Sequence, residues 1–276
     1  MSISERLEKE GIIKSKNAFR FLAVFSGKAS NLKPGDYALD AAKSSFELMQ
    51  EIVSGPHREA VVTIPEGYSI FEIDRELSSK GISLPGVFFR YAKEKSLEGK
   101  LFPDTYIFFT NSLPEDIAEK FLTNFKNKTS EIFGNKSDKE ILEILKLAAL
   151  IEKEVPGDED RAIISGILKK RMKLGVPLQV DATICYVKKA SAYPQDVPCY
   201  PLGTLDFKVR SDYNTYLHKG LTPTPIGNPG ISAIKAAIYP KESPYLYYLS
   251  DPKTKKTVFS KTLEEQNDNR SKYLGL

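Results

Sequence analysis

The chain has 276 residues and a mass of 30.9 kDa, which is long enough for two ordinary domains. Hydrophobic residues make up 41% of the sequence and charged residues 28%, a balance that excludes the fibrous and disordered classes. The 40 Lys and Arg residues and 36 Asp and Glu residues give a formal net charge of +4, and the two signs alternate along the chain. This distribution argues against nucleic acid as a ligand.

The residue types that usually hold metals are sparse. Cys185 and Cys199 have neither a CxxC spacing nor a histidine cluster beside them, so the sequence predicts no metal site, and a disulfide between them stays open. His57 and His218 are interpreted as surface or loop residues, because no Ser or Cys motif accompanies them. We therefore expect neither a metal nor a cofactor.

The start of the chain bears on membrane attachment. No run approaches the roughly 20 apolar residues that span a bilayer, and the first residues lack the charged-then-apolar order of a signal peptide. The sequence opens directly on an amphipathic helical pattern. We therefore expect a membrane anchor upstream of Met1.

The first 110 residues are predicted to form a small α+β region. Apolar spacing, helix caps and turn residues indicate helices at 4–11, 18–26, 44–53 and 70–80, a turn at 33–37 that leads into a strand, and a strand at 60–64. Ile70, Ile73 and Leu77 share one helical face, which is typical of simple packing. The strand, turn and helix of 64–82 also resemble a glycan-binding LysM unit, so a LysM-like module is predicted at about 58–110.

A connecting helix and linker are expected at 111–136, and a second domain at 137–276. The second domain opens on Ser137 and Glu140, which have the spacing of a capping box. Its expected elements are helices at 141–155, 158–174, 230–238 and 263–273, strands at 245–250 and 257–260, and a loop-rich stretch that ends near 216.

Two carboxylates lie near the end of the 141–155 helix. Glu152 falls inside the apolar stripe of this helix, and Glu154 falls at its margin. Partial burial and the negative end of the helix dipole both favour a protonated carboxyl group, which suits a general acid. A neighbouring donor could equally satisfy either residue, so helical periodicity does not choose between them.

Several segments, taken in order, resemble the YceG/MltG-like family of endolytic peptidoglycan lytic transglycosylases. They cover nearly the whole chain and lie at 97–106, 147–154, 178–186, 213–216, 220–223, 225–230 and 245–248. The resemblance implies an α+β fold with the catalytic Glu near the C-terminal end of a helix, and it selects Glu154 as that residue. It also implies a substrate groove, with contacts from Glu152, Gln179, Asp181, Thr183, Tyr186, Tyr213, Asn214, Thr215, Tyr216 and Asn228. Structural support is the alternative role for the groove residues.

The sequence departs from the family pattern around Asp181. Val180 and Ala182 stand where relatives carry Thr and Pro, and the chain has no Trp. Sugar stacking is therefore expected from tyrosines, with Tyr106, Tyr186, Tyr213 and Tyr216 as candidates.

The implied reaction uses one carboxyl group as both acid and base and leaves a 1,6-anhydro end on N-acetylmuramic acid. The alternatives are a non-catalytic glycan-binding protein and a hydrolysing muramidase, which needs two carboxylates. An aminodeoxychorismate lyase would need a pyridoxal phosphate site, and no Lys and phosphate-loop pattern supports one. The resemblance also implies peptidoglycan strands and peptidoglycan synthases as partners, and a location on the extracytoplasmic side of the cell membrane.

Overall fold

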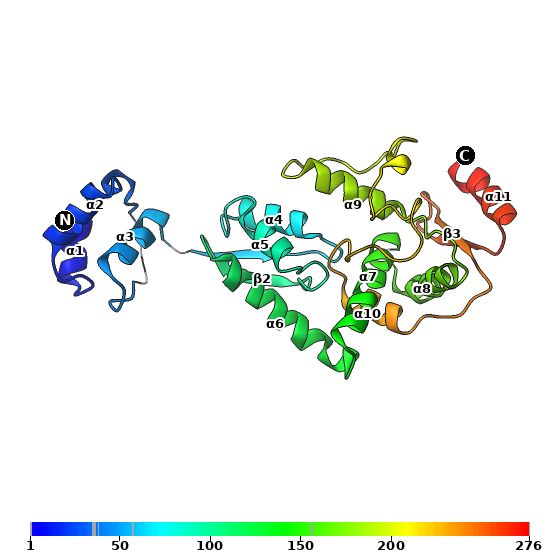
Figure 1. The fold of residues 1–276 in the computed structure, drawn as a ribbon, viewed down its shortest axis with the longest axis horizontal. Helices are drawn as coiled ribbons and strands as arrows, with labels where there is room; N and C mark the ends of the chain where they lie inside the picture. The colour runs from blue at the N-terminus through cyan, green and yellow to red at the C-terminus, as the bar shows by residue number, and fades with distance from the viewer. Residues whose placement is uncertain (1, 35–36, 38, 57, 156, 276) are drawn as a thin grey trace.

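The computed structural model describes residues 2–275 except 35–36, 38, 57 and 156. Its elements follow one another along an elongated molecule, with three helices at one end and the C-terminal hairpin and helix at the other (Figure 1). The helices and strands are α1 (Ile3–Lys9), α2 (Lys16–Phe25), η1 (Ala29–Asn31), α3 (Ser45–Ser54), β1 (Glu59–Thr63), α4 (Ile70–Ser79), α5 (Val87–Glu94), β2 (Thr105–Phe109), α6 (Pro114–Phe133), α7 (Asp138–Glu154), α8 (Asp158–Lys173), α9 (Asp181–Ala192), η2 (Asp206–Lys208), α10 (Ile231–Ile238), β3 (Tyr247–Ser250), β4 (Thr257–Ser260) and α11 (Leu263–Leu274). The predicted α+β fold is confirmed.

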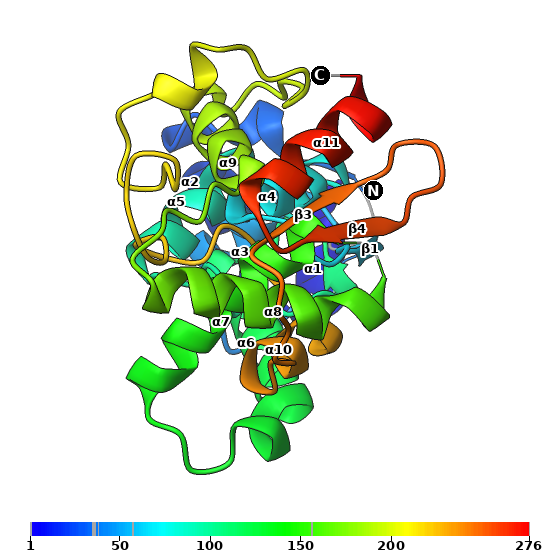
Figure 2. The same cartoon turned by 90° about the vertical axis from the view of Figure 1, so that its right-hand side faces the viewer.

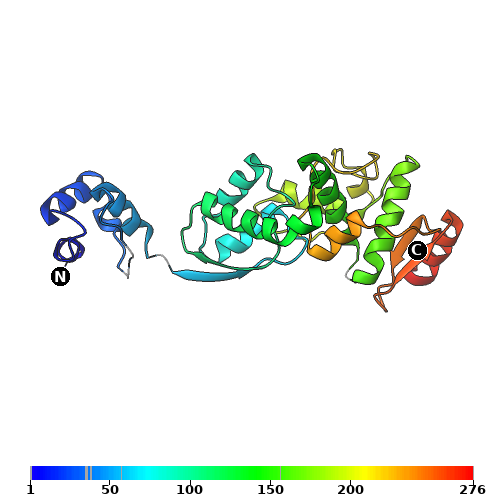
Figure 3. The ribbon, with the colours of Figure 1, turned by 90° about the horizontal axis from the view of Figure 1, so that it is seen from below.

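The N-terminal helices α1, α2 and α3 form a small unit of their own, set apart from the rest of the ribbon (Figure 3). Phe19, Leu48 and Met49 are among the fully buried residues of its core. The turn predicted at 33–37 lies partly outside the described residues. The strand expected after it is not formed by residues 39–44, which precede α3 without regular structure.

The next unit has the order β1-α4-α5-β2, and its two strands pair antiparallel with Val61 opposite Ile107. Strand β1 and helix α4 lie where the sequence predicts them, whereas α5 and β2 are additional elements that the sequence pattern does not predict. Along β2 the side chains alternate between the core and solvent, as expected for a strand with one covered face. Tyr106 is on the core side and only 7% exposed, and it donates a hydrogen bond to the Phe102 carbonyl at 2.6 Å. The prediction that Tyr106 stacks on a sugar is therefore wrong in this conformation.

Helix α6 connects two hydrophobic cores. Ile117 and Phe121, in its first half, are buried with the β1-α4-α5-β2 unit, whereas Phe133, at its end, is buried with α7 and α8. Helix α6 therefore contributes to both cores.

The third core is built mainly by α7, α8 and α10. Helix α7 begins at the predicted capping box, in which Ser137 accepts the Glu140 amide and Glu140 accepts the Ser137 amide. Residues 181–192, predicted to belong to a loop-rich stretch, form helix α9 instead. The error has a physical reason: the short apolar run of 182–187 is flanked by no Ser or Thr cap, and Val180 at the N-cap position makes no side-chain cap. At the far end α11 lies beside the antiparallel β3–β4 hairpin (Figure 2).

Candidate active site

The last three residues of α7 point in three directions, because successive side chains on a helix are about 100° apart. Glu152 meets Arg161 of α8, Lys153 lies near Glu72 of α4, and Glu154 contacts Tyr248 of β3. One helix end therefore joins three parts of the chain at a single place.

Glu154 is the residue of this group whose environment suits acid and base chemistry. The Tyr248 hydroxyl donates to Glu154 Oε2 at 2.7 Å. Burial raises the pKa of Glu154 to about 7; the Tyr248 hydrogen bond opposes this shift, and the charge of Asp181 adds to it. Near neutral pH the residue therefore populates both its acidic and its basic form, as a group that alternates between donating and accepting a proton requires.

Asp181 lies close enough to Glu154 to influence its charge. It is the first residue of α9, and it accepts a hydrogen bond from the Tyr216 hydroxyl. Tyr200 is 62% exposed. Its pKa is raised, mainly because the ring is partly buried and in smaller part because Asp181 and Glu154 carry negative charge nearby. An exposed aromatic ring therefore lies near both carboxylates, where a sugar face could stack on it.

Glu152 has a structural environment. Its side chain is 5% exposed, and it accepts the Arg161 guanidinium at 2.6 Å and the Gly230 amide at 2.9 Å. These donors favour a structural role for Glu152 over the substrate contact that the resemblance implied. With both oxygens engaged, Glu152 fixes the start of α10 against α7 and supports its neighbour Glu154.

The loop of 225–230 joins the catalytic side of the molecule to the β1-α4-α5-β2 unit. Asn228 exchanges backbone hydrogen bonds with Gly67 and Tyr68, at 2.7 and 2.8 Å. A Cβ on Gly227 would lie 2.3 Å from the Gly67 carbonyl oxygen, so the two backbones touch where only glycine fits.

Glu98 lies beneath this loop and is 6% exposed. It accepts the Asn228 side-chain amide at 3.0 Å, the Ile70 amide at 3.1 Å and the Tyr186 hydroxyl at 3.3 Å. Burial raises the pKa of Glu98 to about 8, so it is mostly protonated at neutral pH. Glu98 therefore ties three separate segments together at the junction.

Four of the predicted groove residues are buried in this structure, and their side chains bond within the protein: Thr183, Asn214, Thr215 and Asn228. Their burial favours the structural alternative over direct substrate contact. The hydroxyl groups of Thr183 and Thr215 tie the start of α9 to the 213–216 loop, which positions Asp181 and Tyr216 beside each other.

The other predicted contacts lie at different distances from Glu154. Tyr186 and Tyr213 are half-buried and pack on each other with ring centroids 5.0 Å apart, and Tyr186 also packs on Phe71. Gln179 is exposed, and its side-chain oxygen accepts a hydrogen bond from Arg171 at 2.6 Å. His218 is exposed, as expected, and His57 lies outside the described residues.

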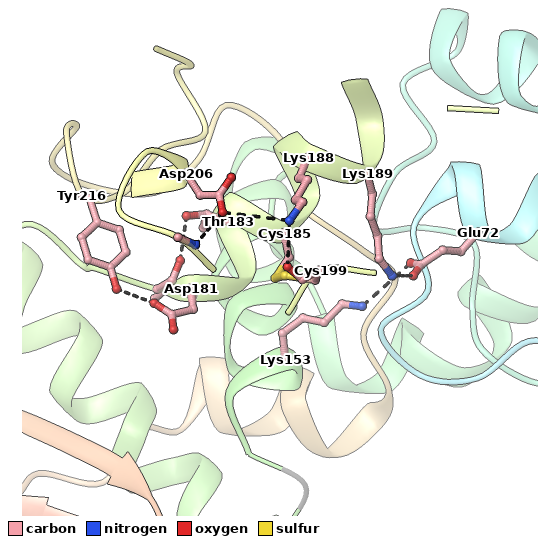
Figure 4. Close-up of a disulfide and its surroundings, with 12 residues drawn as sticks. Glu72, Lys153, Asp181, Thr183, Cys185, Lys188, Lys189, Cys199, Asp206 and Tyr216 are labelled. Carbon is pink, nitrogen blue, oxygen red and sulfur yellow. Dashed lines mark hydrogen bonds and ion pairs between the residues drawn. A yellow bond between two sulfur atoms is a disulfide. The ribbon is translucent and has the colours of Figure 1, made fainter. Parts of the chain in front are cut away.

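The open question about the cysteines is answered by a disulfide between Cys185 and Cys199, with Cα atoms 5.1 Å apart. Figure 4 shows it between Asp181 and Tyr216 on one side and Lys153, Lys189 and Glu72 on the other. The bridge holds the loop that carries Tyr200 against α9.

Sequence reasoning missed Tyr248, Glu98, Arg161 and Tyr200. Tyr248 and Glu98 lie inside segments that carry the family resemblance, but the residue type alone does not reveal the hydrogen-bond partner of either side chain. Arg161 could have been found as a charged residue on the inner side of α8, where it needs a buried counter-charge.

In the described part of the chain, no group of three His, Cys, Asp or Glu residues is arranged to hold a metal ion. No helix among the same residues combines the length and the apolar character of a membrane span.

Comparisons with known proteins show which family the chain belongs to. An endolytic murein transglycosylase of Bacillus subtilis is 30% identical over 99% of this chain and 81% of its own length, and one of Streptococcus pneumoniae is 26% identical over 99% of this chain and 56% of its own length. A crystal structure of a YceG-like protein from Listeria monocytogenes has a TM-score of 0.62 and 29% identity, and the match covers 96% of this chain and 94% of that one. The model of the YceG-like family matches residues 1–272, and the chain belongs to that family.

Proposed function

We propose that this protein is an endolytic murein transglycosylase, which cleaves the bond between N-acetylmuramic acid and N-acetylglucosamine within peptidoglycan strands, with Glu154 as the catalytic residue. The observation that carries the proposal is the pKa of Glu154, which burial raises to about 7 beside an exposed aromatic ring. The names of the relatives from Bacillus subtilis and Streptococcus pneumoniae support the same activity.

In the proposed reaction, protonated Glu154 donates its proton to the glycosidic oxygen as the bond to C1 breaks. The resulting carboxylate takes the proton of the C6 hydroxyl on the same muramic acid, whose oxygen attacks C1 and closes a 1,6-anhydro ring. The Tyr248 hydroxyl, 2.7 Å from Glu154 Oε2, holds the carboxyl group in one orientation and stabilises its charged form. No water molecule is consumed.

A hydrolysing muramidase is the second candidate, because Asp181 is a second carboxylate near Glu154. A hydrolase needs a second carboxylate beside the acid, either to activate water or to act as nucleophile. Asp181 is near enough to raise the pKa of Glu154, and Tyr216 holds it in place. The two reactions differ in product, since hydrolysis leaves a reducing end.

The β1-α4-α5-β2 unit, 58–110, is proposed to be a LysM-like glycan-binding module, because the strand, turn and helix of 64–82 resemble those of a LysM unit. Residues 137–276 would form the catalytic domain, joined to the module through 111–136. By the same resemblance, the protein would act outside the cell membrane, follow an upstream anchor and work beside peptidoglycan synthases.

Digestion of purified peptidoglycan tests these assignments. Wild type should release fragments with anhydro ends, and Glu154→Gln should release none, since an amide cannot donate or accept the required proton. The exposed Glu143→Gln, on the same helix, is the matched control and should behave as wild type. Mass spectrometry that finds reducing ends would establish the muramidase instead. Binding without release by wild type would leave only a glycan-binding protein.

A further inference from the structure

A cavity of about 150 Å³ lies between α4, α9 and the end of α7, beside the candidate active site. Its walls come from both the β1-α4-α5-β2 unit and the catalytic side, and the lining residues used here are Glu72, Lys153, Lys189 and Tyr200. Tyr200 lines the cavity, and the charge of Glu154 contributes to its raised pKa. The Tyr200 side chain is therefore near both the cavity and Glu154. The proposed reaction does not use this space.

Two ammonium groups converge on the cavity around one carboxylate, as Figure 4 shows. Lys189 donates to Glu72 Oε1 at 2.7 Å, whereas Lys153 Nζ lies 3.9 Å from Glu72 Oε2, beyond hydrogen-bond distance. The second oxygen of Glu72 is already occupied by the amide and hydroxyl of Ser69, at 2.9 and 2.8 Å. Glu72 therefore cannot satisfy all the donors that face it.

The cluster carries a positive charge. Burial alone would raise the pKa of Glu72, but the charge of Lys153 and the hydrogen bonds from Lys189 and Ser69 outweigh it and lower that pKa, so Glu72 is ionised. Glu98, nearby, is mostly neutral because its pKa is about 8. Two ammonium groups against one carboxylate leave a charge of about +1 next to a cavity with room for roughly five waters at about 30 Å³ each.

We propose that this cavity is a subsite for a carboxylate carried by a substituent of the glycan strand, held by Lys153 and Lys189. The inference rests on the proposed function and specifies its substrate: a strand that still carries acidic groups on its muramic acid. Lys153 is the primary contact, because the described part of the chain offers its ammonium no hydrogen-bond acceptor within reach. Lys189, already fixed by Glu72, supplies a second donor.

The test is a cycle that pairs a change in the protein with a change in the substrate. Peptidoglycan with unamidated stem peptides is compared with the same material after carbodiimide coupling to methylamine, which converts its carboxylates to amides. Wild type should show a kcat/KM about tenfold lower on the amidated strands, mainly through KM, as expected for one lost charge-assisted contact. Lys153→Met should lose a similar factor on the native strands and little more on the amidated ones.

Several controls separate this role from a structural one. Lys189→Arg keeps the positive charge and should retain most of the preference for native over amidated strands. The exposed Lys139→Met, at the other end of α7, should show the same preference as wild type. In strands that carry stem peptides the lactyl carboxyl is bonded to the peptide as an amide, so the free carboxylates there belong to the peptide. Removal of the peptide frees the lactyl carboxylate. Loss of the Lys153 effect on stripped strands shows that the subsite takes the peptide carboxylate alone, and persistence shows that it also takes the lactyl carboxylate.

Equal cleavage of native and amidated strands by wild type, or an equal loss by Lys153→Met on both, would overturn the subsite. Absence of cleavage by wild type on every substrate would instead overturn the proposed function. The subsite would then be decided by co-sedimentation with native and amidated peptidoglycan: lysine-dependent preference for the native form supports it, and equal binding rejects it.

Discussion

Replacing Glu154 by Gln should stabilise the protein at alkaline pH. Glu154 has a pKa of about 7 in the folded protein against an ordinary value of 4.5. Between these two values the folded state binds more protons than the unfolded state, so the stability that the protonated group contributes is complete below pH 4.5 and is lost as the pH rises through 7. At about 1.4 kcal/mol per pKa unit, the loss is on the order of 3 kcal/mol.

Gln has nearly the same shape and no charge, so Glu154→Gln avoids this penalty. The free energy of unfolding of the variant should equal that of wild type near pH 4 and exceed it by about 3 kcal/mol near pH 8, a substantial part of the stability of an ordinary domain. Denaturant unfolding followed by circular dichroism across this range measures the difference. The exposed Glu131→Gln on α6 is the control substitution.

A difference between wild type and Glu154→Gln that stays constant from pH 4 to pH 8 would refute the reasoning, since it would mean that burial does not perturb this carboxyl group. A variant less stable than wild type at pH 8 would refute it as well. In that case the Tyr248 hydroxyl would stabilise the charged carboxylate more than burial destabilises it.

Three further substitutions test the surroundings of the site. Tyr248→Phe removes a donor that lowers the pKa of Glu154. The alkaline limb of the plot of kcat/KM against pH should therefore shift to higher pH by about one unit. An unshifted limb would mean that Tyr248 does not affect the pKa of Glu154. Glu98→Ala leaves three donors unpaired at the junction and should lower the free energy of unfolding by about 3 kcal/mol, measured by denaturation, with Glu98→Gln much milder. Gly227→Ala should reduce activity and thermal stability because its Cβ meets backbone, whereas Gly230→Ala meets only the movable Glu66 side chain and should be tolerated better.

Local signals in the sequence predicted most helices but not the connections between them. The capping boxes at Ser44 and Ser137 are complete within four residues, so the starts of α3 and α7 could be predicted from sequence alone. Strand β2 and helix α9 depend on partners far along the chain, namely β1 and the 213–216 loop. The spacing of apolar residues carries no information about such distant partners, so neither element was predicted.

The same distinction explains how much of the site could be predicted. The family pattern selected Glu154, and helical spacing placed it at the margin of the apolar stripe. Tyr248, which is 94 residues away from it, could not be paired with it from spacing. The family resemblance implied Thr183 and Asn214 as groove contacts, but the structure buries both side chains.

The position of Asp181 links the pKa of the acid to the choice of reaction. A charged Asp181 favours the protonated form of Glu154, which the first step of either reaction requires. In the second step the requirements diverge: a transglycosylase needs the new Glu154 carboxylate to take a proton from the substrate, whereas a hydrolase needs a second base or nucleophile. Asp181 is held by the Tyr216 hydroxyl, which reduces its availability as a base and leaves its charge in place. The arrangement therefore favours a role for Asp181 as a fixed charge that stabilises positive charge at C1, and with it the anhydro product.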